Sequence, residues 1–92
     1  MINSDIASEV INSFCDINVH DYVKSIPLFV IYNNPSDFPG KYVCRLYDAA
    51  QAIKFATVSN TLEDARKTIP PGEYLRIPAE KWDDPVIAEI WI

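Results

Sequence analysis

A cysteine, a histidine and two aspartates occur close together near the start of the chain, as Cys15, Asp16, His20 and Asp21. These are the residue types of a thiol nucleophile, a general base and the carboxylate that orients the base. The chemistry requires the groups to lie within hydrogen-bond reach, and nothing in this spacing brings them together. Cys15 follows Phe14 at an apolar position and is expected in the core, whereas His20 is expected on the surface. The chain is therefore predicted not to be an enzyme.

Four acidic residues in the last part of the chain could offer carboxylate oxygens to a hard cation: Glu80, Asp83, Asp84 and Glu89. The segment lacks the alternating acids and the glycine of a calcium-binding loop. Asp83 or Asp84 can instead form an Asx-turn that leads into Pro85. The sequence accordingly predicts no metal ion and no cofactor.

Basic side chains alternate with tyrosines along the chain, as in surfaces that bind nucleic acid by stacking and charge: Lys41, Arg45, Arg66, Lys67 and Arg76 with Tyr42, Tyr47 and Tyr74. Period-two counting places Lys41, Arg45 and Tyr47 on one strand face. The formal charge of −5 and the pI near 4.6 oppose binding to a phosphate backbone. Amphipathic cross-strand pairs account for the same residues, so no direct nucleic-acid partner is predicted.

The acidic charge is concentrated at the start of the chain, where no basic residue precedes Lys24. Asp5, Glu9, Asp16 and Asp21 carry this charge. Two interpretations remain open: the acidic residues attract a basic partner, or they form a solvated helix face that keeps a small protein soluble.

The segment from Asn33 to Gly40 is longer than a tight hairpin turn. Asn34 can cap backbone groups, the prolines stiffen the segment, and Phe38 can anchor it to the domain. It is either a structural connection or a rigid recognition loop, in which Asn34 and Phe38 would contact a partner.

Trp82 and Trp91 are the candidate anchors of an interface. Alternation along 86–92 places Trp91 with Ile87 and Glu89, opposite Val86, Ala88, Ile90 and Ile92. If helices pack on that second group, Trp91 lies on the outer sheet face, with Val43 as a further neighbour. The alternative is that a helix covers the Trp91 face too.

The elements that position these residues are five expected strands and three expected helices. Apolar runs and alternation predict strands at 28–32, 41–48, 53–59, 74–77 and 86–92. Tyr42, Cys44 and Leu46 share one face, and at 74–77 Leu75 and Ile77 point inward while Tyr74 points outward. Helical spacing predicts helices at 4–14, at 19–26 before Pro27, and from 61 to Pro70-Pro71-Gly72.

The 92 residues are predicted to form one domain, with a helical N-terminal section at 1–26 and a sheet core with one inserted helix at 27–92. The expected fold class is α+β: a single mostly antiparallel sheet of four to five strands, with two or three helices packed on one face. Within the inserted helix, Thr61 and Asp64 resemble a capping box, and Glu63 can pair with Lys67.

Cys15 and Cys44 lack metal or CxxC spacing and are both expected as buried free thiols in a reducing compartment. The chain shows neither the pattern of a signal peptide nor an apolar run long enough to cross a membrane. A cytoplasmic protein that does not contact a membrane is therefore predicted.

Four motifs resemble small uncharacterised proteins of bacterial and bacteriophage genomes: Tyr32-Asn33-Asn34-Pro35-x-Asp37-x-Pro39-x-Lys41-Tyr42-Val43, Thr61-Leu62-Glu63-Asp64-Ala65-Arg66, Ile69-Pro70-Pro71-Gly72 and Asp83-Asp84-Pro85-Val86-Ile87-x-Glu89-x-Trp91. The resemblance covers about residues 28–92 and implies no particular activity. A phage-borne protein of this kind is expected to bind a host component, such as a defence complex that binds nucleic acid.

These features predict a non-enzymatic, acidic protein-binding module, with inhibition of a host defence complex as its role. The first alternative is a structural homo-oligomer, most simply a homodimer, that pairs through a sheet edge or through the Trp91 face. A small ligand-binding domain or enzyme is a minor alternative, since no pattern indicates a pocket with converging polar groups.

Overall fold

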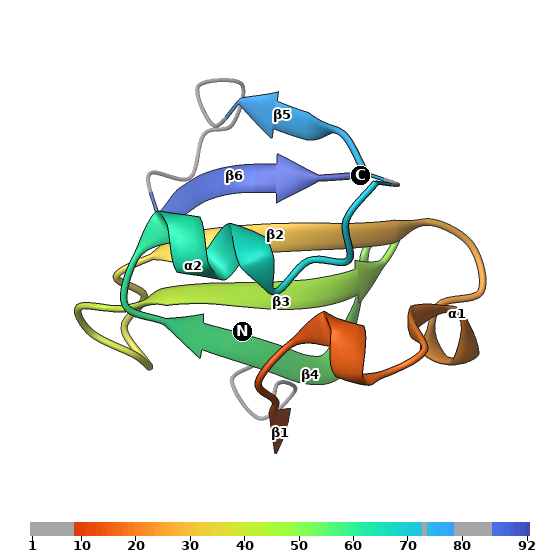
Figure 1. The fold of residues 1–92 in the computed structure, drawn as a ribbon, viewed down its shortest axis with the longest axis horizontal. Helices are drawn as coiled ribbons and strands as arrows, with labels where there is room; N and C mark the ends of the chain where they lie inside the picture. Colours follow the sequence, from red (N-terminus) through yellow and green to blue (C-terminus); the bar gives the residue numbers. More distant parts are fainter. Residues whose placement is uncertain (1–8, 73, 79–85) are drawn as a thin grey trace.

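In the computed structural model the described residues are 9–72, 74–78 and 86–92. They form six strands and three short helical segments, in the order β1 (Glu9–Val10), η1 (Phe14–Asp16, a 3₁₀ turn), α1 (Val19–Tyr22), β2 (Pro27–Asn33), β3 (Tyr42–Asp48), β4 (Gln51–Ser59), α2 (Leu62–Lys67), β5 (Arg76–Pro78) and β6 (Ile87–Trp91). The strands form one six-stranded sheet, whose arrangement can be followed in Figure 1. Among the described residues no helix is long and apolar enough to span a membrane.

The sheet has the strand order β1-β4-β3-β2-β6-β5. Four of its five strand pairings are antiparallel, and only β1 runs parallel to its neighbour β4. The α+β class is therefore confirmed, while the sheet is mixed and has six strands where four to five were predicted. The additional strand is β1, which lies in a segment that was predicted to be helical.

The centre of the sheet follows the sequence pattern closely. β2 and β3 pair residue for residue, from Pro27 opposite Asp48 to Asn33 opposite Tyr42. Strands at the expected positions of β2, β3, β4 and β6 are confirmed. An uninterrupted apolar run such as 28–32 suits a strand that is covered on both faces, and β2 lies between β3 and β6 in the interior of the sheet.

The helix predicted over 4–14 is wrong for its described part. Glu9 and Val10 pair with Phe55 and Ala56 of β4, and the Ile11 N–H donates to the Ala56 carbonyl at 2.8 Å. The edge of β4 offers unpaired backbone groups, and pairing with them outweighs the weak helical preference of this segment. The next predicted helix is a single turn, which Asn18 caps and which ends at Tyr22 rather than at Ile26.

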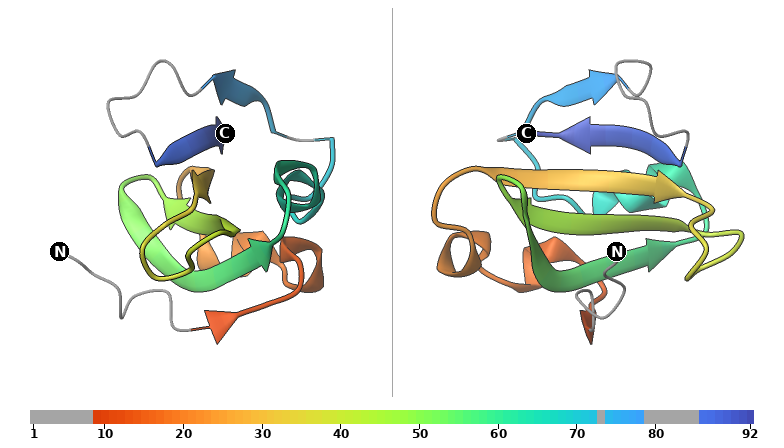
Figure 2. Two further views of the ribbon diagram at one scale, coloured as in Figure 1. Left: turned by 90° about the vertical axis from the view of Figure 1, so that its left-hand side faces the viewer. Right: turned by 180° about the vertical axis from the view of Figure 1, so that it is seen from behind.

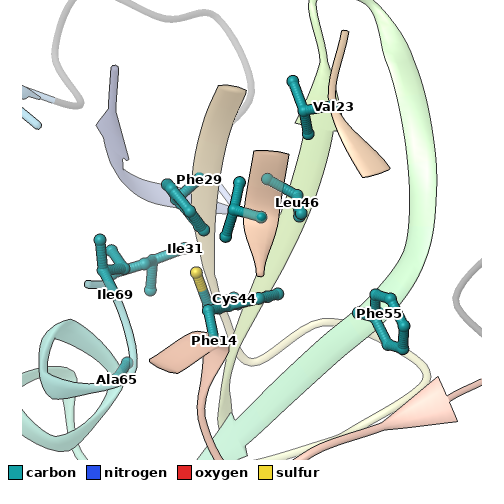
Figure 3. Packing of buried hydrophobic residues seen from close by; sticks show 10 residues of the cluster. Phe14, Val23, Phe29, Ile31, Cys44, Leu46, Phe55, Ala65 and Ile69 are labelled. Atoms are coloured by element: carbon teal, nitrogen blue, oxygen red, sulfur yellow. The ribbon is translucent and has the colours of Figure 1, made fainter. Parts of the chain in front are cut away.

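The helical segments cover one face of the sheet, as Figure 2 shows from the side. Figure 3 shows the core that results, in which buried side chains of β2, β3 and β4 meet those of α2 and η1. Cys44 and Leu46 point into this core as predicted, and Tyr42 packs against it. The ring of Phe14 meets that of Phe29 edge to face, with centroids 5.1 Å apart. Phe14 thereby attaches the N-terminal section to the sheet.

The opposite face of the sheet also has buried side chains at its centre. Alternation along the strands places Val30, Val43, Ala56 and Ile90 there, and all of them are buried. On the same face the hydroxyl groups of Tyr32 and Tyr47 lie 2.8 Å apart. Val43 is thus on the predicted side of the sheet but is not exposed there.

The two cysteines differ in environment. Cys44 is a buried free thiol, as predicted, and burial raises its pKa far above the ordinary value, although a hydrogen bond with Thr68 acts in the opposite direction. Cys15 is free but exposed, so the prediction that it is buried is wrong. The turn of η1 buries Phe14 and leaves the next side chain facing solvent.

Candidate interaction surface

Two hollows adjoin the segment that follows α2. In Figure 1 this segment runs from the end of α2 to β5. The larger, of about 360 Å³, is called the Trp91 hollow and is lined by Arg66, Lys67, Ile69, Pro70, Pro71, Gly72, Tyr74 and Trp91. The smaller, of about 270 Å³, is called the Cys15 hollow and is lined by Phe14, Cys15, Ile17, Asn18, Val19, His20, Pro70 and Tyr74. Pro70 and Tyr74 border both hollows.

The position of both hollows depends on how α2 begins and ends. Thr61 caps the helix by accepting a hydrogen bond from the Asp64 N–H at 3.1 Å, as its sequence pattern predicts. At the other end, the buried Thr68 hydroxyl donates to the Ala65 carbonyl at 2.7 Å and lies 2.9 Å from the Thr57 hydroxyl of β4. The Thr68 carbonyl accepts from the Phe14 N–H at 2.9 Å. Thr68 therefore joins α2, β4 and η1 beside both hollows.

A rigid turn forms the wall of the Trp91 hollow. Two prolines restrict the backbone after Ile69, and Gly72 has a φ of 90°, which only glycine adopts readily. After the turn, Tyr74 contacts the core again: its ring packs edge to face on Phe29, with centroids 4.9 Å apart. The prediction that Tyr74 points outward and Leu75 inward is therefore wrong, because Leu75 is 76% exposed.

The exposure of Leu75 follows from the backbone pairing at the end of the sheet. Leu75 and Ile92 exchange two hydrogen bonds, of 2.8 and 2.9 Å, which continue the ladder between β5 and β6. In that register Arg76 lies opposite Trp91. Side chains alternate between faces, so Leu75 turns away from the helical side, where Tyr74 and Trp91 lie.

The sequence left two arrangements open for Trp91, an outer sheet face or a face covered by a helix, and Trp91 lies on the helical side of the sheet. Phe29 lies opposite Trp91 and Ile31 opposite Glu89 in the pairing of β2 with β6. Directly opposed residues share a face of the sheet. Trp91 accordingly packs, half-buried, against the core on the helical side. The same face of β6 also carries Glu89, and its burial is possible because Arg66 of α2 neutralises the carboxylate.

Glu89 forms the main buried polar interaction near the Trp91 hollow, with only 4% of its surface exposed. Arg66 of α2 donates from Nε to both of its oxygens, at 3.0 and 3.1 Å, and from Nη2 to Oε2. Arg76 of β5 donates at 3.4 Å, and the Trp91 indole N–H donates at 3.0 Å. Glu89 thus connects α2 to two strands and fixes the orientation of Arg66 and Trp91.

The pKa values of this cluster reflect its contacts. Burial raises the pKa of Glu89, but the hydrogen bonds from Arg66 and Trp91, the charge of Arg66 and the hydrogen bond from Arg76 together outweigh it, so the pKa is lowered overall. The hydrogen bond with Glu89 raises the pKa of Arg66, and the charges of Glu89 and Glu63 add to this effect. Glu89 and Arg66 are therefore both charged at neutral pH.

The described acidic residues of the N-terminal section lie on three different elements. Glu9 is in β1 and pairs with Lys54 at 3.0 Å. Asp16 and Asp21 are exposed on η1 and α1. Asp5, like Trp82, lies outside the described residues. Of the two interpretations that the sequence left open, a shared helix face is not found among the described residues, because Glu9, Asp16 and Asp21 lie on three different elements.

The predicted recognition loop is held by its own contacts. Asn34 has a φ of 56°, and its side chain accepts a hydrogen bond from the Gly40 N–H at 2.6 Å. Asp37 forms an ion pair with Arg45 of β3. Phe38 is half-buried. These contacts connect the loop to itself and to β3.

The structure brings together only some members of the two groups that the sequence suggested for catalysis and for metal binding. Cys15 and His20 line one hollow, while Asp16 and Asp21 are exposed residues that are not among its lining. Within the described ranges, no group of three or more His, Cys, Asp or Glu side chains is arranged to hold a metal ion. Of the predicted acidic cluster, Glu89 is engaged with arginines, and Glu80, Asp83 and Asp84 lie outside the described residues.

Of the predicted interface residues, only Trp91 lines a described hollow. As candidates for a binding surface, its neighbours Arg66, Lys67 and Tyr74 were considered only as parts of a basic and aromatic alternation. A local sequence pattern could have predicted that these residues lie together: two cations at the end of a helix, followed by the Pro70-Pro71-Gly72 turn and then by an aromatic residue. Comparison with models of known protein families, with curated proteins and with solved structures found no significant match.

Proposed function

We propose that this protein is a non-enzymatic protein-binding module and that the Trp91 hollow is its main contact site. One observation carries the proposal: Arg66, Tyr74 and Trp91 line the same open hollow. Tryptophan, tyrosine and arginine are the residue types that supply most of the binding energy at protein interfaces. Here each of the three is already oriented by contacts within the domain.

The rigidity of the hollow supports the same proposal. Ordering side chains on association costs free energy, so a surface whose groups are already ordered binds more tightly for the same contacts. The Pro70-Pro71-Gly72 turn and the Glu89 cluster supply this order. The resemblance to phage-borne proteins favours a host component, such as a defence complex, as the partner.

The proposal is tested by capturing the partner from host cells and measuring its direct binding to the purified domain. Trp91→Leu is expected to weaken binding by about thirtyfold or more, since an interface anchor contributes about 2 kcal/mol or more. Leu75→Ala, which shortens an exposed apolar side chain outside the hollow, is the matched control. Thermal unfolding of each variant shows that the fold is retained.

A photo-crosslinking residue at Pro71 provides a second readout that does not depend on a core substitution. The captured partner is expected to crosslink from position 71 and not from position 36, where Ser36 is exposed in the 33–41 loop. The proposal would be contradicted if the partner crosslinked only from positions other than 71 and if Trp91→Leu bound the partner as tightly as the wild type.

The second candidate function is a homodimer that pairs through the β5 edge of the sheet. It is favoured by Leu75 and Ile92, two exposed apolar residues that are hydrogen-bonded to each other beside that edge. A dimer should appear in light scattering at high micromolar concentration and should dissociate in Leu75→Lys. A wild-type monomer under these conditions eliminates this candidate.

A further inference from the structure

The Trp91 hollow has a positively charged rim in a protein of net charge −5. We infer that the hollow binds an acidic segment of the partner, an extended stretch that carries Asp or Glu beside an aromatic or aliphatic side chain. This inference rests on the proposed function and adds the chemical class of the partner. Arg66 and Lys67 are the cations of the rim, and the described lining residues include no carboxylate.

Lys67 is available for such a segment. The ion pair with Glu63 that helical spacing predicts is not formed, and Lys67 has no ion pair with any described residue. Its side chain is exposed at the last position of α2. An incoming carboxylate would therefore gain a cation without breaking an ion pair with any residue that the structure describes.

Arg66 contributes a second, preorganised cation. Its hydrogen bonds to Glu89 use Nε and Nη2, and Nη1 makes no hydrogen bond among the described residues. The guanidinium is held in place by Glu89, so less conformational freedom remains to be lost when another acceptor binds. Arg76 shares the same carboxylate, so two arginines oppose one glutamate and the cluster keeps a positive charge.

The floor of the hollow fits the apolar part of the segment. Ile69, Tyr74 and Trp91 provide a surface of one aliphatic and two aromatic side chains next to the cations. Tyrosine and tryptophan bury a large apolar area on contact and are enriched at interfaces. An acidic residue next to an apolar one fits this pairing of an apolar surface with cations.

The negative charge of the rest of the protein does not cancel this local preference. Charges farther away than a Debye length, about 8 Å at physiological ionic strength, are largely screened. Among the described residues, the nearby cations are Arg66, Arg76 and Lys67, and the nearby carboxylates are Glu89 and Glu63, which leaves an excess of one positive charge at the hollow. The remaining acidic surface disfavours an acidic segment elsewhere. The expected result is binding of acidic peptides at this one place.

The test selects short random peptides, displayed on phage, on the purified wild-type protein. The selected peptides are expected to be rich in Asp and Glu next to Phe, Tyr, Trp or Leu. Lys67→Glu should weaken their binding about five- to tenfold, because it replaces an attractive exposed charge by a repulsive one. Lys54→Glu makes the same change of net charge on β4, outside the hollow, and should change binding less than about twofold.

The outcomes distinguish the two levels of the proposal. One outcome is that the selected peptides are basic or neutral, crosslink at position 71 and bind Lys67→Glu as tightly as the wild type. This outcome would overturn the inference that the segment is acidic and would leave the protein-binding function intact. Acidic peptides that lose affinity equally in Lys67→Glu and Lys54→Glu would also overturn it, because they respond only to net charge. Failure to select any peptide that crosslinks at position 71 would count against both.

Discussion

Replacing Glu89 with alanine should lower the free energy of unfolding by about 2–3 kcal/mol. The substitution removes a buried carboxylate that accepts hydrogen bonds from Arg66, Arg76 and Trp91. The estimate is below the loss expected from breaking a fully buried ion pair, because both arginines are partly exposed and can be hydrated. Urea denaturation at neutral pH measures the change.

Two variants serve as controls for Glu89→Ala. Glu63→Ala removes an exposed carboxylate from α2 and should change stability by no more than about 0.5 kcal/mol. Glu89→Gln keeps the shape of the side chain and loses its charge, so it should fall between Glu89→Ala and the wild type. Equal stability of Glu89→Ala and Glu63→Ala would show that the cluster does not stabilise the fold.

The same cluster predicts a dependence on pH. The folded-state pKa of Glu89 is lowered below the value of about 4.3 that an unfolded glutamate has. Its contribution is therefore complete above about pH 4.3 and is lost as the pH falls through the folded-state pKa. The difference in stability between wild type and Glu89→Gln should be constant near neutrality and decrease in acid. A difference that grows as the pH falls would contradict this assignment.

Phe29→Ala is expected to have the largest effect, about 3–5 kcal/mol of unfolding free energy. Phe29 is fully buried at the centre of the core and meets the rings of both Phe14 and Tyr74. The substitution leaves a cavity and removes the support of both the N-terminal section and the Trp91 hollow. A small domain has only about 5–15 kcal/mol of total stability, so partial unfolding at room temperature is expected.

Circular dichroism during urea and thermal denaturation measures this loss. Leu75→Ala removes a comparable apolar volume from a site that is 76% exposed and should cost less than about 0.5 kcal/mol. Phe29→Leu, which keeps much of the buried volume, should cost about 1–2 kcal/mol and allow the hollow to be tested in a folded protein. Equal losses for Phe29→Ala and Leu75→Ala would show that the core is not centred on Phe29.

Local chemistry was sufficient to predict the central strands and the inserted helix. The apolar run at 28–32 and the alternation at 41–48 correspond to β2 and β3, and Thr61 begins α2 as its side chain predicts. These features depend on contacts between residues that are close in sequence: period-two alternation and side-chain capping. Alternation also correctly grouped Glu89 with Trp91 on one face of the last strand.

Which face meets the helices was decided only in three dimensions. Sequence alone left open which face of the last strand meets the helices, and burying Glu89 without a partner would be costly. In the folded protein Arg66 and Arg76, far from Glu89 in sequence, make that burial favourable, and Trp91 is carried to the same side. In the same way, residues 9–10 form a strand because they pair with the edge of β4. Both outcomes depend on partners distant in the chain, and a pattern of neighbouring residues contains no information about where such partners lie.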